Sequence, residues 1–136
     1  MVAHNEYVDL LLDGKEMAAS AWADNADGHR VYAGAKHALC CWMRRQTPDL
    51  ARQGVRINAV APGIIDTPLS DRVMVDGDLG AAMRDFAESV PLGQIGKPEQ
   101  VASVVAFLLS EAASFITGSI VFADGGHDAM MRPDAF

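Results

Sequence analysis

The sequence predicts an α/β fold built on a parallel sheet. Two short segments rich in branched apolar residues, 55–62 and 119–123, have the composition of buried strands. Each follows a segment with apolar residues at helical spacing, 31–46 and 98–111, and helices that alternate with buried strands are typical of parallel sheets. Because a parallel strand needs neighbours along its edges and two strands alone are unstable in water, we expect only part of an α/β domain.

The composition is that of a folded domain. The 136 residues correspond to about one domain. Half of the residues are hydrophobic and 21% are charged, which excludes a disordered chain. The net charge of −7 disfavours nucleic acid and anionic membrane surfaces. No apolar run approaches the roughly 20 residues that span a bilayer, the N-terminus lacks the basic start of a signal peptide, and two cysteines exclude a disulfide scaffold. We expect a cytoplasmic protein with a small-molecule or protein partner, no nucleic acid and no membrane.

The N-terminal region predicts one helix and one loop. Residues 5–22 are expected to be helical because their apolar residues can share one side, although Gly14 weakens the pattern. Residues 24–30 are polar and rich in turn formers, so they predict a loop.

Residues 31–46 predict a helix with small and apolar residues along its length. Thr47 and Pro48 have the character of an N-cap and a first helical residue, so we expect a break or kink there and one or two further turns up to Arg52. Gly54 is expected to end the helix, since glycine is common just after a helix C-terminus.

The predicted strand 55–62 stops at Pro62 and Gly63. Residues 64–96 hold most of the turn formers of the middle region, so they predict a long connection with one or two short helices.

Residues 98–111 form the clearest predicted helix, with Pro98 at its first position and apolar residues at the spacing of one helix face. The strand 119–123 follows, and residues 124–126, Asp-Gly-Gly, predict the turn that leaves it.

Tyr32 and Lys36 are four residues apart on the predicted helix and therefore share a face. A free tyrosine titrates near pH ~10 and is a poor proton donor or acceptor at neutrality, but a nearby ammonium group favours the phenolate. The pair is therefore a candidate acid–base group. The alternative is an ordinary pair on a helix surface with the phenol half-buried.

The Pro62-Gly63 turn lies at the carboxyl end of a predicted buried strand, which is where open α/β sheets bind ligands. The turn frees backbone N–H and C=O groups and Thr67 adds a hydroxyl, and together these groups are able to hold a planar amide. The alternative is an ordinary turn in which Thr67 caps a helix that begins at Pro68.

Three segments together resemble the C-terminal half of short-chain dehydrogenases/reductases. They are YAGAK at residues 32–36, VRINAVAPGIIDTP at residues 55–68, and the stretch from GKPEQ to ADGG at residues 96–126. The resemblance covers residues 31–126 nearly without a gap. The tail after this stretch and the long segment before YAGAK are most similar to bacterial 3α-hydroxysteroid dehydrogenases of that family.

The resemblance implies the C-terminal portion of a Rossmann-like, doubly wound parallel sheet whose N-terminal half is missing from this sequence. We expect a single partial domain over residues 1–136. Its parts are an N-terminal helix and loop (1–30), a catalytic helix and strand (31–63), a substrate lid (64–96), and a helix, last strand and tail (97–136).

The resemblance also implies NAD(P)-dependent oxidoreduction of an alcohol or ketone by a homo-oligomer, with a steroid-like hydrophobic compound as the candidate substrate. Tyr32 matches the catalytic tyrosine that exchanges a proton with the substrate oxygen. Lys36 matches the lysine that lowers the pKa of that phenol and holds the nicotinamide ribose. The positions matched to the cofactor site, besides these two, are Pro62, Gly63, Ile65 and Thr67. No metal is expected.

The apolar residues of the substrate lid are candidates for holding a hydrophobic substrate, or else for packing the lid onto the domain. These residues are Leu69, Val73, Met74, Met83 and Phe86.

The family's glycine-rich phosphate-binding turn and its NAD-against-NADP selector are absent from this sequence. Ser20 lies twelve residues before Tyr32, as the family's carbonyl-polarising serine would, but its surroundings predict a helix and not the end of a strand. We expect that serine to precede Met1. These departures predict negligible turnover by the isolated chain. They leave two alternatives. One is a non-catalytic fragment that acts through self-association or a partner, with segments 98–111 and 119–123 as its interface, and the other is an incomplete sequence.

Overall fold

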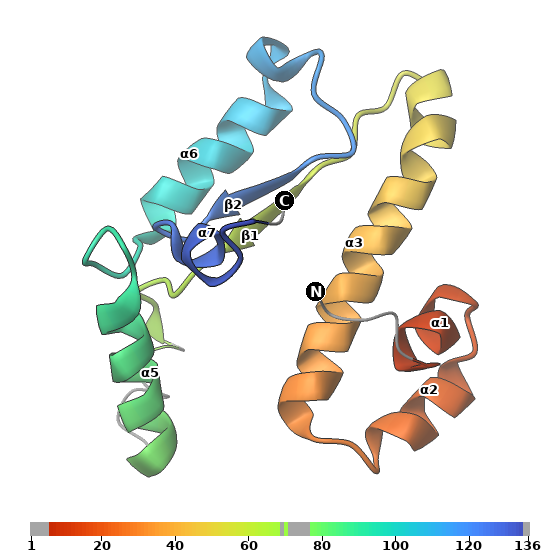
Figure 1. The fold of residues 1–136 in the computed structure, drawn as a ribbon. Coiled ribbons are helices and arrows are strands. Elements are labelled where there is room, and N and C mark those ends of the chain that lie inside the picture. The colour runs from red at the N-terminus through yellow and green to blue at the C-terminus, as the bar shows by residue number, and fades with distance from the viewer. Residues whose placement is uncertain (1–5, 69, 71–76, 135–136) are drawn as a thin grey trace. The chain divides into compact units, whose positions relative to one another are not determined.

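The structure of the chain is a computed structural model that describes residues 6–68, 70 and 77–134 (Figure 1). The chain divides into two compact units. The helical unit comprises Met1–Ile57 with Thr117–Ser119, and the sheet unit comprises Asn58–Ile116 with Ile120–Phe136. Each unit is described by itself.

The helical unit begins with two short helices, α1 (Glu6–Leu12) and α2 (Glu16–Ala23). The prediction of a single helix over residues 5–22 is therefore wrong, because two helices take its place. Gly14 adopts a left-handed φ of 69°, and a glycine pays no steric penalty for that conformation. The chain turns there, and α2 starts afresh.

The long helix α3 (Gly28–Arg52) starts earlier than predicted, because Asp27 caps it. The Asp27 carboxylate accepts hydrogen bonds from the backbone N–H of His29 at 2.9 Å and of Arg30 at 3.3 Å. The residues predicted as the end of a loop are thus the first turn of the helix.

Of the break or kink predicted at Thr47-Pro48, the break is wrong, since α3 runs through Pro48 to Arg52 without interruption. The Thr47 hydroxyl donates a hydrogen bond to the Met43 carbonyl at 3.0 Å, one turn back, and does not cap a new helix. The end at Gly54 is confirmed, with a left-handed φ of 75°.

The core of the helical unit lies where α1 packs against α3 and α2. Tyr7 and Val8 are buried, and the Tyr7 ring stacks on Trp22 with centroids 4.8 Å apart. A Cβ atom at Gly34 would lie 2.8 Å from Cδ1 of Tyr7. Glycine at this position is therefore what allows α1 to approach α3 so closely.

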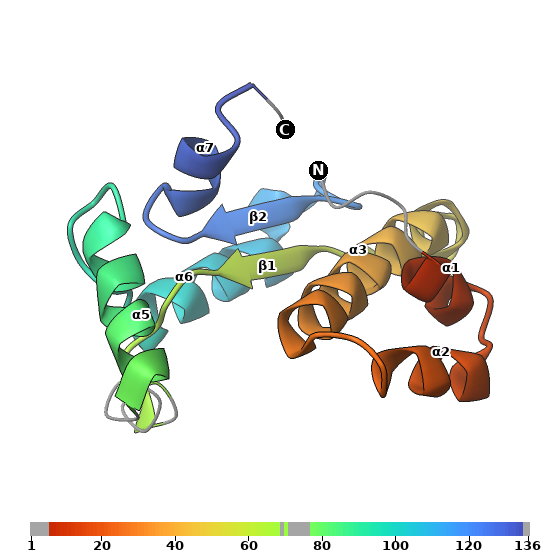
Figure 2. The same cartoon turned by 60° about the horizontal axis from the view of Figure 1, so that its bottom comes forward.

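The sheet unit is built on two parallel strands, β1 (Ala59–Pro62) and β2 (Ile120–Ala123), with Ala59 opposite Ile120 (Figure 2). The predicted parallel α/β arrangement and its two strands are confirmed, but both strands are shorter than predicted. Gly118 has a φ of 74°, which no extended strand accommodates, so regular pairing starts only after it.

Helix α6 (Pro98–Leu109) packs against both strands and matches the predicted helix apart from its last two residues. A 3₁₀ turn, Glu111–Ala113, follows it. Helix α5 (Gly77–Ser89) lies in the predicted connection 64–96. For residues 77–79, 82 and 83 of α5 only the backbone is described.

The tail, which carries no helical pattern that we could predict, contains the short helix α7 (His127–Met131). Among the helices of the described residues, none is both long and apolar enough to cross a membrane.

Candidate functional site

Tyr32 and Lys36 lie together on α3, as the spacing predicts. The Lys36 ammonium nitrogen is 5.6 Å from the centroid of the Tyr32 ring, within the range of a cation–π contact. Tyr32 is 67% exposed and Lys36 is also exposed. The phenol hydroxyl is therefore open to a reactant in this chain, and it is not half-buried as the surface-pair alternative expected.

The packing of α3 explains why this face is open. Gly34, which receives α1, lies midway between Tyr32 and Lys36 in the sequence. At about 100° per residue, both side chains project from the side of the helix opposite Gly34. Leu39, on the same side of the helix about two turns further along, is 56% exposed.

The charge of Lys36 also affects the next turn of the helix. Burial raises the pKa of the Cys40 thiol, the neighbouring Cys41 raises it further, and the Lys36 ammonium lowers it in part. Cys41 in turn lies 3.5 Å from Nε2 of His37. The charge of Lys36 therefore reaches Cys40, one turn further along α3.

A separate candidate region, within the sheet unit, is the carboxyl end of the β1–β2 pair. The Gly63 N–H donates a hydrogen bond to the Ala123 carbonyl at 3.1 Å. A Cβ atom at Gly63 would lie 2.8 Å from Cα of Asp124, so the two loops touch through their backbones. This contact fixes the loops after β1 and β2 side by side at the sheet edge.

The loop after β1 is held by a second backbone pairing. Asp66 N–H donates to the Gly96 carbonyl at 2.8 Å, and Gly96 N–H donates to the Ile64 carbonyl at 2.9 Å. Within the described residues, the Ile65 N–H has no acceptor. A fixed, available backbone donor at the carboxyl end of a strand fits a planar amide such as the carboxamide of nicotinamide.

Thr67 is part of a reciprocal cap. Its hydroxyl accepts a hydrogen bond from the Ser70 N–H at 3.3 Å, and its own N–H donates to the Ser70 hydroxyl at 2.8 Å. Pro68 and Ser70 are helical. This is the capping role that we considered as the alternative to a cofactor contact.

A cavity of about 570 Å³ opens beside these loops in the sheet unit. Its walls are largely apolar, with Ile65 and Val90 from the loops and Val101 from α6, and polar groups enter through Gln100 and Asp124. A cavity of this size and character is typical of small-molecule sites.

Of the five candidate lid residues, Leu69, Val73 and Met74 lie outside the described residues, and Met83 is described by its backbone alone. Phe86 packs on His127, with ring centroids 4.0 Å apart. In this structure Phe86 therefore has the packing role.

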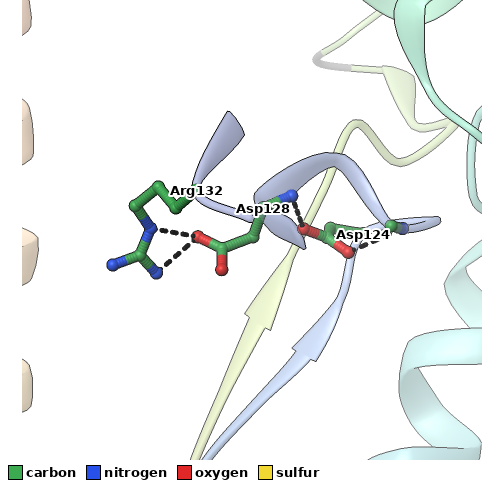
Figure 3. A network of polar contacts seen from close by, with 4 residues as sticks. Asp124, Asp128 and Arg132 are labelled. Carbon is green, nitrogen blue, oxygen red and sulfur yellow. Dashed lines mark hydrogen bonds and ion pairs between the residues drawn. The ribbon is translucent and has the colours of Figure 1, made fainter. Parts of the chain in front are cut away.

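A polar network that we did not predict follows β2 (Figure 3). The Asp124 carboxylate accepts hydrogen bonds from the N–H groups of Gly126 at 2.9 Å and Asp128 at 2.7 Å. Arg132 donates two hydrogen bonds, at 3.0 and 2.6 Å, to one oxygen of Asp128. The four-residue spacing of Asp124, Asp128 and Arg132 is the sequence signal that could have predicted helix α7.

Ser20 lies on α2 and is exposed, so it does not stand at the end of a strand. Tyr32 and Lys36 belong to the helical unit, whereas Pro62, Gly63, Ile65 and Thr67 belong to the sheet unit.

Comparison with known proteins identifies the family. A family model of the short-chain dehydrogenases/reductases, described as enoyl-(acyl carrier protein) reductase, matches residues 16–128, which is most of the chain. The chain belongs to the short-chain dehydrogenase/reductase family.

Among its relatives in this family, the 3α-hydroxysteroid dehydrogenase/carbonyl reductase of Comamonas testosteroni is 39% identical over 126 residues, which are 90% of this chain and 48% of that protein. The 2,5-dichloro-2,5-cyclohexadiene-1,4-diol dehydrogenase of Sphingobium indicum is 39% identical over 114 residues, 83% of this chain and 44% of that protein. The chain thus spans about half the length of the curated relatives it matches.

Solved structures also resemble this chain over about half of their own length. The 3α-hydroxysteroid dehydrogenase from Pseudomonas sp. B-0831, solved with NADH, superposes with a TM-score of 0.90 at 43% identity, covering 99% of this chain and 53% of that one. Levodione reductase superposes with a TM-score of 0.68 at 35% identity, covering 77% of this chain and 42% of that one. The Rossmann-like fold class is therefore shown, for a chain that corresponds to part of the fold.

Proposed function

We propose that this chain is the catalytic half of an NAD(P)-dependent oxidoreductase that interconverts an alcohol and a ketone. The observation that carries the proposal is the Tyr32–Lys36 pair on the open face of α3, with the ammonium 5.6 Å from the ring centroid. Membership of the short-chain dehydrogenase/reductase family supports the assignment of this pair to catalysis.

In this proposal Tyr32 moves the proton. Its hydroxyl donates a proton to the substrate oxygen during reduction and, as phenolate, removes the proton from the alcohol during oxidation. The Lys36 ammonium stabilises the phenolate by its charge, and the exposure of both groups allows a substrate to approach.

The cofactor in this proposal is NAD or NADP, which supplies or accepts the hydride. The loop after β1 would hold its nicotinamide, with the Ile65 N–H as the donor to the carboxamide and Gly63 keeping the loop close to β2. Pro62 and Thr67 would line the same loop. In the family resemblance, Lys36 corresponds to the lysine that binds the ribose hydroxyls.

We propose a bulky, hydrophobic, steroid-like alcohol or ketone as the substrate. The match to the 3α-hydroxysteroid dehydrogenase from Pseudomonas sp. B-0831 covers 99% of this chain and so includes α1 and α2. The apolar walls of the cavity in the sheet unit also favour a hydrophobic ligand.

We further propose that these 136 residues alone have negligible activity. The sequence contains no glycine-rich turn to hold a pyrophosphate at a helix N-terminus, so most of the binding energy for a dinucleotide is lacking.

A non-catalytic role through self-association is the second candidate. Leu109 is 78% exposed and Phe115 is fully exposed, and large exposed apolar side chains near a two-stranded sheet favour association. The same surfaces support a homo-oligomeric state of the enzyme in the first proposal.

The test is a chimera in which residues 31–126 replace the matching segment of the Comamonas testosteroni enzyme. With a 3α-hydroxysteroid and NAD(P), we expect activity that Tyr32→Phe lowers by about 10²–10⁴-fold, the usual contribution of a general acid–base group. Tyr32→Phe removes one hydroxyl. The matched control is Tyr7→Phe in a second chimera that exchanges residues 6–126, because the Tyr7 ring packs on the side of α3 opposite Tyr32 and the substitution removes the same hydroxyl.

Unchanged activity in the Tyr32→Phe chimera would refute the assigned role. For the isolated chain we expect no cofactor oxidation above background, and a turnover that Tyr32→Phe abolishes would refute the proposed inactivity.

A further inference from the structure

The C-terminal end of α5 is joined to the turn after β2 by several independent contacts within the sheet unit. The aromatic contact is that of Phe86 with His127, whose ring centroids are 4.0 Å apart at an interplanar angle of 54°. Tilted ring pairs in close contact are attractive beyond the area that they bury. One ring comes from the last turns of α5 and the other from the first residue of α7.

The backbone after α5 adds two further contacts. The Leu92 N–H donates a hydrogen bond to the Gly125 carbonyl at 3.1 Å. Val90 is 5% exposed, and a Cβ atom at Gly125 would lie 2.5 Å from its Cγ1 atom. Since Gly125 also has a φ of 67°, only glycine fits this contact without strain.

The turn that receives α5 is itself held firmly. Asp124 accepts two backbone hydrogen bonds from within residues 126–128, and Arg132 pairs with Asp128 one turn later (Figure 3). The ring of His127 therefore projects from a turn whose backbone is fixed at both ends.

We propose that His127 is a positioning residue that anchors the C-terminal end of α5 through Phe86. By holding α5, it sets the boundary of the substrate lid and so determines how well bulky substrates are distinguished from small ones. The selectivity part rests on the proposed function, whereas the anchoring part rests on the contacts alone.

The two parts are tested by separate readouts. Hydrogen exchange followed by mass spectrometry of the 136-residue chain measures the opening of residues 84–92 in His127→Ala, His127→Phe and Met131→Ala. The Met131 side chain is 64% exposed on the same helix and serves as the matched control. Exchange in α6 and circular dichroism report whether each variant is folded.

We expect His127→Ala to raise exchange in residues 84–92 by about three- to tenfold, the effect of losing one aromatic pair. His127→Phe keeps the ring contact and should remain within about twofold of the parent, as should Met131→Ala. Unchanged exchange in His127→Ala, or an equal rise in Met131→Ala, would overturn the anchor.

Selectivity is measured in a chimera extended to residue 136, as the ratio of kcat/KM for a 3α-hydroxysteroid to that for cyclohexanol. We expect His127→Ala to lower this ratio at least threefold, mainly through the KM of the steroid, and His127→Phe to restore it. Faster exchange with an unchanged ratio would overturn the selectivity role and leave the anchor standing. An inactive parent chimera would count against the proposed function, and the exchange data would still decide the anchor.

Discussion

The helical unit and the sheet unit differ in how completely their apolar residues are enclosed. In the described residues, the buried apolar side chains of the helical unit are Tyr7, Val8, Ala19, Ala38 and Met43, whereas those of the sheet unit are Val90, Leu108 and Ala113. No residue of β1 or β2 is fully buried, and Phe122 in β2 is 48% exposed.

This difference follows from the contacts that each architecture needs. Helices α1–α3 are consecutive in the chain and bury their apolar faces against one another. Parallel strands are normally covered on both faces and flanked by further strands, and β1 has only β2 as its partner among the described residues. The helical unit therefore encloses a core where α1 packs on α3, while the two strands of the sheet unit have room for further contacts.

The largest expected effect is on the packing of α1 against α3 in the helical unit. Gly34→Ala places a methyl group 2.8 Å from the Tyr7 ring and should cost about 1–3 kcal/mol of unfolding free energy, measured by urea denaturation. Gly28→Ala is the matched control on the same helix, because a Cβ atom there would meet no other element of the described chain within 4 Å. Equal stability of the two variants would contradict the close approach of α1.

The next effect concerns the sheet unit. Asp124→Ala removes the acceptor of two backbone N–H groups in the turn after β2 and should cost about 1–2 kcal/mol. Asp66→Ala is the control. The exposed Asp66 donates its backbone N–H to Gly96, which the substitution keeps, and no described residue donates a hydrogen bond to its carboxylate. Thermal unfolding followed by circular dichroism compares the two, and a larger loss in Asp66→Ala would show that the network is unimportant.

The third effect concerns the exposed apolar surface of the sheet unit and alters neither core. Leu109→Gln should weaken self-association while changing the unfolding free energy by no more than about 0.5 kcal/mol, since the side chain is 78% exposed. Met17→Gln replaces an apolar side chain by the same amide at a residue that is 87% exposed in the helical unit. Sedimentation velocity over a concentration series should show the effect for Leu109→Gln alone.

The smallest expected effect is on thiol chemistry. Burial and Cys41 raise the pKa of Cys40, so less thiolate is present at pH 8 and alkylation is slower than for a free cysteine. Lys36→Met removes the charge that partly opposes this shift, and the rate should fall further. Mass spectrometry of iodoacetamide labelling checks the order, and faster labelling in Lys36→Met would reverse the assigned sign.

The sequence predicted what local patterns encode. The apolar spacing of residues 98–111 located α6, the branched runs located both strands, and the spacing of Tyr32 and Lys36 placed them on one face. What it missed depends on single contacts. The Asp27 cap moved the start of α3, and the bond of Thr47 to the Met43 carbonyl replaced the expected new helix cap.

The site was predictable in part for the same reason. The turn at Pro62-Gly63 follows from residue type, but its contact with Asp124 joins residues 61 positions apart. Likewise, no local pattern links Phe86 to His127. Contacts of this kind are set by how the chain packs, and a single sequence carries no direct record of them.

The close approach of Gly63 to Asp124 has a consequence for exchanging parts between homologous enzymes. The two backbones leave no room for a side chain at Gly63, so this crossing is a fixed reference point in the sheet unit. A recombination junction placed away from Gly63 and Asp124 leaves this crossing intact. A junction that shifts the segment at Gly63 or the segment at Asp124 separates the ends of β1 and β2 and the loops that follow them.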